Sequence, residues 1–261
     1  MKNGIFILLI TLIFLSCSGK NETYNAAGEK ETEELEKEKR QDFYLIYFNF
    51  NLAIAQYKLG LIDKEVAAQK IESLLKDTED FYNARSEKLY SYEDWVFPLQ
   101  GYGPDQIGGK NGNGFKSNKS DFLEGKYSGH PAHDIFIFDK NQDNLDDRTN
   151  QPVNVLSLSG GIVVSTKESW MLGDKSKGGK FIWVYDPVTQ SVFYYAHNNE
   201  IFVDVGDLVK PGDKIATVGR TGNAFESRSP THLHLGMFKI IDKLPQPHNY
   251  YKELVKAKQV G

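Results

Sequence analysis

The pattern of apolar and polar residues changes several times along this chain of 261 residues. A short apolar run near the start is followed by a charged segment. Apolar residues then recur at helical spacing from residue 42 to about 90, and strand-like alternation dominates 95–252. This order predicts a signal segment (1–16), a charged tether (17–41), a helical hairpin (42–90) and a mostly β domain (95–252).

The apolar run "GIFILLITLIFL" is too short to span a bilayer comfortably, and it follows a lysine, as in the apolar core of a secretory signal. The only cysteine, Cys17, comes directly after "FLS". This arrangement resembles a bacterial lipoprotein signal, although Phe14 stands where leucine is usual. We therefore predict cleavage before Cys17, lipidation of its thiol, and a lipid anchor in the cell envelope, in the periplasm or at the outer membrane. An ordinary signal peptide with an incidental cysteine is the alternative.

The helical region contains two amphipathic patterns separated by Gly60 and Asp63. Gly60 is suited to ending the first helix and Asp63 to capping the second. The first apolar stripe is Leu45, Phe48, Leu52, Ala55 and Leu59, and the second is Ala67, Ile71, Leu74 and Leu75. We predict a helical hairpin that acts as a spacer or as a docking element for a protein partner.

Glycine becomes frequent beyond Trp95, and strand patterns replace helical ones. "VNVLSLSGGIVVST" predicts two strands that break at Gly160-Gly161, and "FIWVYDPVTQSVFYYAH" predicts a hairpin that turns at Asp186-Pro187. "THLHLGMFKI" alternates regularly. Because no long helical pattern separates these strands, the sequence predicts a mostly antiparallel sheet.

The segment "THLHLG" places His232 and His234 two residues apart, so a strand would direct both imidazoles to one face. Two such histidines on a solvent-facing strand are common and by themselves indicate little. The segment "HPAHD" adds His130 and Asp134, which can converge on one ion because a loop precedes the strand at Asp134. With one histidine of the first pair they would make three protein ligands, the usual number for catalytic zinc.

A further histidine, His197, ends the segment "YYAH". Together, the HxxxD spacing of "HPAHD", this lone histidine, the HxH of "THLHLG" and the glycine-rich "IFVDVGDLVKPGDKIATVGRTG" resemble the lysostaphin-type (LytM-like) zinc metallopeptidases. The resemblance extends over about residues 95–251. It implies an antiparallel β-sheet domain with a β-barrel-like groove and one zinc ion.

The resemblance also implies roles. His130, Asp134 and His234 correspond to the zinc ligands, and His197 and His232 to the catalytic pair; which histidine is the general base stays open. The chain has no HExxH motif, so a histidine pair would replace the usual glutamate base.

The implied substrate is a peptide bond of peptidoglycan, and we favour stem-peptide cross-links over pentaglycine bridges. Two alternatives stay open. The protein could be a wall-binding activator of amidases that retains its metal, or a peptidase that acts on a peptide outside the wall.

The chain departs from the family pattern next to the HxxxD residues. Ala132 stands where glycine is usual, and His133 is an additional histidine. As the neighbour of Asp134 in a strand, His133 is expected to point to the opposite face.

The segment "DKNQDNLDD" places Asp139, Asn141, Asp143 and Asp147 at positions 1, 3, 5 and 9 of an EF-hand-type calcium loop. Asn144 and Asn150 replace the expected glycine and bidentate glutamate, so an Asx-rich turn is the alternative to a calcium site.

Among the aromatic residues, Tyr127 lies close to His130 in a glycine-rich segment and is a candidate for a substrate groove. Tyr194 and Tyr195 are expected to pack in the sheet or its core. The net charge of −4 shows no broad basic surface, so we expect no nucleic-acid partner.

Overall fold

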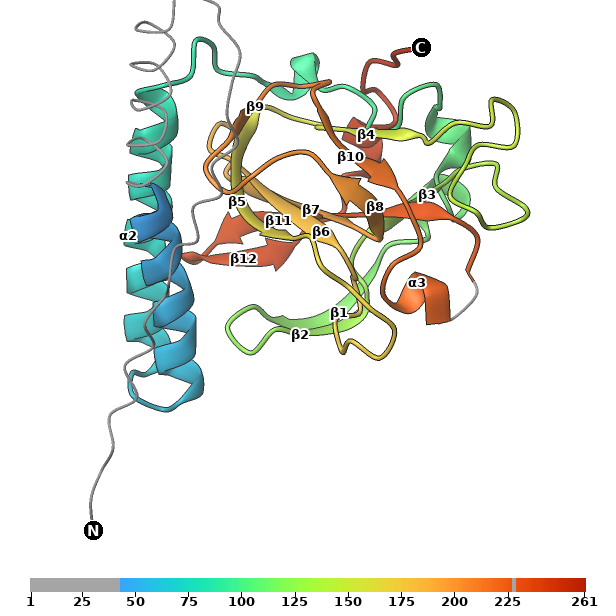
Figure 1. Ribbon diagram of the computed structural model, residues 1–261. Coiled ribbons are helices and arrows are strands. Elements are labelled where there is room, and N and C mark those ends of the chain that lie inside the picture. The colour runs from blue at the N-terminus through green and yellow to red at the C-terminus, as the bar shows by residue number, and fades with distance from the viewer. Residues whose placement is uncertain (1–42, 227–228) are drawn as a thin grey trace, which may run out of the picture. The chain divides into compact units, whose positions relative to one another are not determined.

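The computed structural model describes residues 43–226 and 229–261. The predicted signal peptide, the tether and Cys17 lie outside the described residues. The first described element is a helix at 43–58, and α2 (Lys64–Asn83) follows after a turn at Gly60, where φ is +69°. Asp63 caps α2 by accepting a hydrogen bond of 2.8 Å from the Val66 amide. Figure 1 shows the two helices side by side, so the predicted helical hairpin is confirmed. None of the described helices is both long enough and apolar enough to cross a membrane.

The predicted stripe of the first helix, however, faces away from the core. Leu45, Phe48 and Leu59 are 63%, 61% and 74% exposed. The residues that pack against α2 and the sheet come from the other side of the helix: Phe43, Ile46, Tyr47, Phe50, Ile54 and Tyr57. Because this helix is apolar on both faces, periodicity alone does not indicate which face is buried. In α2, Ala67, Ile71 and Leu75 are buried.

The β domain contains a large sheet, a small sheet and a hairpin, and all their ladders are antiparallel. The large sheet has the order β12-β11-β7-β6-β5-β9, with β3 also paired to β11. Its strands are β3 (His133–Phe136), β5 (Gly161–Lys167), β6 (Phe181–Asp186), β7 (Ser191–Ala196), β9 (Leu208–Val209), β11 (His232–Ile241) and β12 (Leu244–Pro247). The small sheet contains β4 (Asn154–Leu156), β10 (Lys214–Val218) and β8 (Asn198–Ile201). The hairpin is β1 (Lys116–Asp121) and β2 (Lys126–His130).

Short helices complete the domain. They are three 3-10 turns (Tyr92–Asp94, Pro104–Gln106 and Lys110–Gly112), α3 (Asn223–Glu226) and α4 (Tyr251–Leu254). The observed fold is mostly antiparallel β with an N-terminal helical hairpin, which confirms the predicted fold class. The break between β4 and β5 and the turn between β6 and β7 also occur where the sequence predicts them.

Two apolar clusters hold the structure together. The larger fills the β domain between the two sheets, with Trp95, Val155, Phe193, Ile215 and Leu235 among its fully buried members. The smaller joins the helical hairpin to the large sheet and includes Phe43, Ile71, Ile162 and Tyr185. The helical hairpin therefore packs onto the β domain through the smaller apolar cluster. The strand ends that carry the histidines lie outside this contact.

Candidate metal centre and cleft

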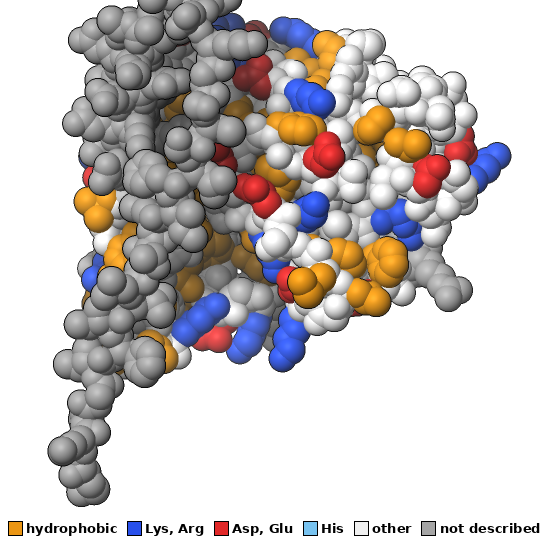
Figure 2. Space-filling model, viewed as in Figure 1, with side chains coloured by type: hydrophobic (Ala, Val, Ile, Leu, Met, Phe, Trp, Pro, Cys, Tyr) orange, Lys and Arg blue, Asp and Glu red, His pale blue; other side chains and the backbone are white. Residues whose placement is uncertain are grey.

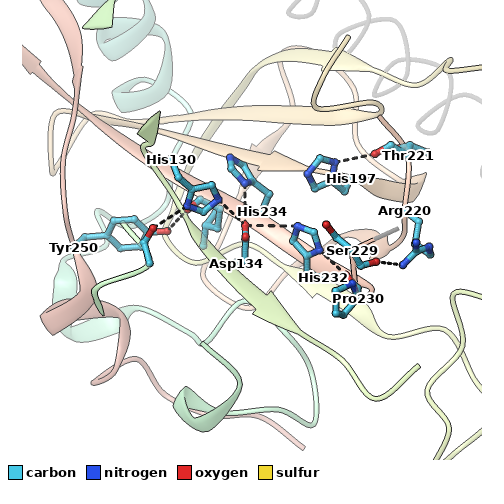
Figure 3. A network of polar contacts seen from close by, with 12 residues as sticks. His130, Asp134, His197, Arg220, Thr221, Ser229, Pro230, His232, His234 and Tyr250 are labelled. Atoms are coloured by element: carbon cyan, nitrogen blue, oxygen red, sulfur yellow. Dashed lines mark hydrogen bonds and ion pairs between the residues drawn. The ribbon is translucent and has the colours of Figure 1, made fainter. Parts of the chain in front are cut away.

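Strand pairing brings His130, Asp134 and His234 together. In the ladder between β3 and β11, His234 lies opposite Asp134. The Oδ1 atom of Asp134 is 2.9 Å from Nδ1 of His234 and 3.1 Å from Nε2 of His130 (Figure 3). One potential ligand atom from each residue lies within 4.8 Å of the others. His130 ends β2 and does not lie in a loop as predicted, but the position allows the same convergence.

The polar partners of His130 determine which of its nitrogens is available. Its Nδ1 donates to the carbonyl of Gly114 at 3.0 Å, because a carbonyl can only accept. Its Nε2 is thus directed at Asp134. The hydrogen bond with that carboxylate raises the pKa of His130 above its ordinary value, against the opposing effect of burial.

The carboxyl group of Asp134 is held as the anion. Burial opposes ionisation, but the hydrogen bonds from His130 and His234 outweigh it and hold the pKa of Asp134 well below its usual range. Two imidazole nitrogens therefore converge on one carboxylate oxygen. Two nitrogens and one oxygen in this arrangement suit zinc as ligands.

His197 and His232 form a second group beside the first, again with His234 within 4.8 Å. Their rings are 5.0 Å apart, centroid to centroid. Each ring is held by a backbone carbonyl (Figure 3): Nδ1 of His197 donates to Thr221 at 2.8 Å and Nδ1 of His232 to Pro230 at 2.7 Å. Each ring is thereby fixed in the tautomer whose Nε2 can accept a proton.

The surroundings of these two histidines favour the neutral form. Burial, followed by the neighbouring imidazoles of His234 and His232, lowers the pKa of His197 to about 3. Burial likewise lowers the pKa of His232 below its ordinary value. The backbone of His197 is left-handed, with φ of +65°, at the point where the chain leaves β7 for β8. A non-glycine residue seldom adopts this conformation, and such residues concentrate at functional sites.

Behind His232, a buried arginine organises the approach to β11. Arg220, only 6% exposed, donates to the carbonyls of Ala224 and Ser229 and to the hydroxyl of Thr231 (Figure 3). Thr231 in turn donates to Asp139 at 2.6 Å. These contacts fix the residues that precede His232, including the Pro230 carbonyl that orients its ring. The sequence alone gave no indication of this role for Arg220.

The two histidine groups open into one cleft of about 760 Å³. Tyr127, the candidate for a substrate groove, lines this cleft, and so do Trp183 and Tyr194. Tyr194 pairs across the sheet with Trp183, ring to ring at 4.4 Å, as the sequence predicts, and it also faces the cleft, with its ring 6.1 Å from that of His234. Tyr195 is fully buried, because neighbouring strand residues face opposite ways.

Two lysines in the segment before β6, Lys175 and Lys177, also line the cleft. Both are exposed, and neither forms an ion pair with another described residue. The carboxylate among the lining residues is that of Asp134. No periodic pattern in the sequence marked these lysines. In Figure 2, Lys and Arg side chains gather at the lower edge of the view, where the β1–β2 hairpin lies in Figure 1.

The extra histidine, His133, lies outside both groups. It is fully buried, its ring packs beside Tyr250 at 5.2 Å, and its Nε2 is 3.1 Å from the amide oxygen of Asn249. This placement on the opposite face of β3 agrees with the alternation of a strand. His248 follows β12 and lies away from the cleft lining.

The candidate calcium loop is bonded within itself. Asp139 accepts from the Asp143 and Asn144 amides, Asp147 accepts from the Lys140 amide, and the amide group of Asn141 donates to Asp143. Within the described residues, neither group of possible metal ligands includes this loop. The loop is an Asx-type turn, and calcium is not supported.

Residues 142–247 match the model of Peptidase family M23. The match contains His197, His232 and His234, and it begins after His130 and Asp134. This match supports a peptidase. Peptidases of family M23 depend on zinc, which agrees with the group formed by His130, Asp134 and His234.

Several solved structures are also similar to this chain. A Ruminococcus gnavus protein named after the glycyl-glycine endopeptidase lytM is 27% identical, over 64% of this chain and 62% of that one, with a TM-score of 0.43. The catalytic domain of lysostaphin from Staphylococcus simulans is 22% identical, over 54% and 88%, with a TM-score of 0.36. A zinc-containing peptidase from Vibrio cholerae is 20% identical, over 64% and 40%, with a TM-score of 0.38. The chain thus spans less than two thirds of the first of these proteins.

Proposed function

We propose that this protein is a zinc-dependent endopeptidase that hydrolyses peptide bonds of peptidoglycan, with stem-peptide cross-links as its preferred substrate. The observation that carries the proposal is the shared oxygen of Asp134, which lies within 3.1 Å of Nε2 of His130 and within 2.9 Å of Nδ1 of His234. These three atoms would hold the zinc ion. When bound, zinc would supply a Lewis acid and a water of lowered pKa.

The chain's own residues supply the proton transfers. His197 and His232 stay neutral near pH 7 because burial lowers their pKa values. Each has its Nδ1 on a backbone carbonyl, so its Nε2 can take a proton from an attacking water. The imidazolium formed in this way can then donate that proton to the leaving amine. Two fixed neutral imidazoles beside the ligand group therefore provide the base and acid that peptide hydrolysis requires.

The preference for stem peptides is supported by charge. Stem peptides carry carboxylates, whereas pentaglycine bridges carry none along their length. Lys175 and Lys177 would receive such carboxylates at the wall of the cleft. A groove with cations and aromatic rings suits an acidic peptide better than a chain of glycines.

We further propose that the mature protein is anchored in the cell envelope by lipid on Cys17, with the tether between anchor and hairpin. This proposal is supported by the sequence of the apolar run and by the position of the single cysteine. It places the cleft within reach of the cell wall.

The proposed function is tested by zinc content and peptidoglycan hydrolysis, measured on the same samples of wild type, His234→Ala and His232→Ala. Wild type should hold about one zinc per chain and release soluble wall fragments. His234→Ala should lose both zinc and hydrolysis. His232→Ala should keep zinc and lose hydrolysis by at least about 100-fold, because it removes a proton carrier and not a ligand.

A histidine outside the site provides the control. His248→Ala should keep zinc and activity, since His248 lies away from the cleft. If wild type binds zinc and cuts no peptidoglycan but accelerates a wall amidase, the protein is an activator that kept its ligands, and the peptidase proposal fails.

A further inference from the structure

The helix at 43–58 and its C-terminal turn expose an apolar stripe on the side away from the domain. Six large apolar side chains on this side are 41% to 74% exposed: Tyr44, Leu45, Phe48, Leu52, Leu59 and Leu61. Apolar residues gathered in this way on a soluble surface usually mark an interaction site.

This stripe is not needed for the packing of the helix onto the domain. The opposite side already supplies Phe43, which is 1% exposed, Ala53, which is 2% exposed, and the half-buried Phe50 and Ile54. A helix that is apolar on both faces is expected to be covered on both faces. The domain covers one face, and the other is left for a second body.

The spacing of the stripe indicates what that body is. Leu45, Phe48, Leu52, Ala55 and Leu59 follow one another at intervals of three, four, three and four residues. These intervals are those of the a and d positions of a heptad, through which one helix packs against another. Alanine within the series lets two helix backbones approach closely.

We propose that this stripe is a dimer interface, in which the helix at 43–58 packs against the same helix of a second copy of the chain. The second copy carries the matching stripe by symmetry, as a two-fold interface requires. The flanking positions suit self-association: Asn49, Asn51 and Gln56 are uncharged, and Lys58 is the only charged residue among them. Two copies therefore meet with little like-charge repulsion.

The chain's own N-terminal segment is a poorer partner. Its predicted tether contains few apolar residues, namely Tyr24, Ala26, Ala27 and Leu35 after Cys17, and they do not repeat at the spacing of the stripe. The residues that line the cleft include none from the helical hairpin, so pairing through the stripe would leave the cleft of each copy open. The interface is thus independent of the proposed hydrolysis.

Site-directed disulfide formation tests the interface in the full chain. With Cys17→Ser the chain has no other cysteine, so an added Leu52→Cys reports on pairing alone. Leu52 is the middle of the stripe and meets its own copy whether the helices run parallel or antiparallel, within disulfide reach. Mild oxidation should give a reducible dimer on a gel. Met171→Cys, at a residue that is 76% exposed and far along the chain from the hairpin, is the matched control and should stay monomeric.

Sedimentation equilibrium of the same full chain, in density-matched detergent, gives the association constant. Wild type should sediment as a dimer, and Phe48→Glu with Leu59→Glu should weaken dimerisation by more than about tenfold, because paired helices would bury the carboxylates. Circular dichroism should show unchanged helix content, since both side chains are exposed in one copy. A wild-type chain that is monomeric over the whole dilution series, with no Leu52→Cys cross-link, overturns the proposal. If that monomer binds phospholipid vesicles through the stripe, the surface is a membrane-facing one instead.

Discussion

Nδ1 of His234 lies 2.9 Å from Oδ1 of Asp134, although the two residues are 100 positions apart in the chain. Their contact depends on the register of β3 against β11, which places them directly opposite. A shift of one residue would turn His234 to the other face of the sheet. The candidate metal centre is therefore a property of strand pairing as much as of ligand identity.

Replacing Asp134 by asparagine keeps the shape of the side chain and removes its charge. We expect zinc affinity to fall by at least about 100-fold, because the anion that both histidines contact is lost. Competition with a chromogenic zinc chelator measures this change. Asp143→Asn, in the Asx-type turn, is the control and should bind zinc as wild type does; equal affinities for the two variants would exclude Asp134 as a ligand.

Arg220 is expected to act on catalysis through His232. Arg220→Met removes the donors to Ser229 and Thr231 while it retains most of the volume. We expect kcat to fall by roughly 10- to 100-fold with KM and zinc content nearly unchanged, because a misplaced His232 slows proton transfer without weakening substrate binding. Steady-state kinetics with a peptide substrate separates the two constants. A parallel rise in KM with loss of zinc would show a general disruption of the site.

Lys175 and Lys177 are expected to determine the preference for acidic peptides. Lys175→Met with Lys177→Met should raise KM by about 5- to 50-fold for a stem peptide with free carboxylates, since each lost ion contact contributes modestly at an exposed site. The amidated form of the same peptide should be cut equally well before and after the change. Lys256→Met, on an exposed residue outside the cleft lining, is the matched control.

Peptide binding to the inactive His232→Ala variant tests the role of the lysines separately from hydrolysis. If that variant binds free and amidated peptides equally, the lysines do not select substrate, whatever the rate of hydrolysis.

Asp186 should make the folded protein less stable as the pH rises. Burial raises its pKa from 3.8 to about 6, against the hydrogen bonds donated by Thr189 and Val188. A carboxyl group whose pKa is raised on folding stabilises the protein below its unfolded pKa, and this contribution is lost as pH rises through the folded value. The loss should amount to about 2 kcal/mol between pH 4 and pH 7.

Urea denaturation of wild type and Asp186→Asn at both pH values tests this expectation. The stability of Asp186→Asn relative to wild type should increase from pH 4 to pH 7, because asparagine does not ionise. A difference that is constant with pH would show that Asp186 ionises in the folded protein as easily as in the unfolded chain.

The sequence predicted the features that repeat at a fixed period. Alternation along "THLHLG" placed His232 and His234 on one face, and the structure brings them into one cleft with His130, Asp134 and His197. Short-range spacing also indicated that His133 turns away. These inferences succeeded because strand geometry is local and strict.

Other features could not be predicted because they depend on what packs against them. The helix at 43–58 is apolar on both faces, so the choice between its stripes is made by the sheet and α2. Tyr194 and Tyr195 are chemically equal, and only the pairing of β7 with its neighbours determines which one faces the cleft. Arg220 and the cleft lysines carry no pattern, because their roles arise from contacts made across the fold.

At His197 the backbone conformation lowers the stability of the fold, while the side chain has the role proposed for it in proton transfer. Its φ of +65° costs roughly 1 kcal/mol or more for a side chain with a Cβ, and glycine or asparagine would adopt it more readily. Selection for stability alone would therefore remove the imidazole here. A stabilised variant library of this protein, screened without a test of activity, should be enriched in changes at His197, so that the most robust molecules would be the ones that no longer work.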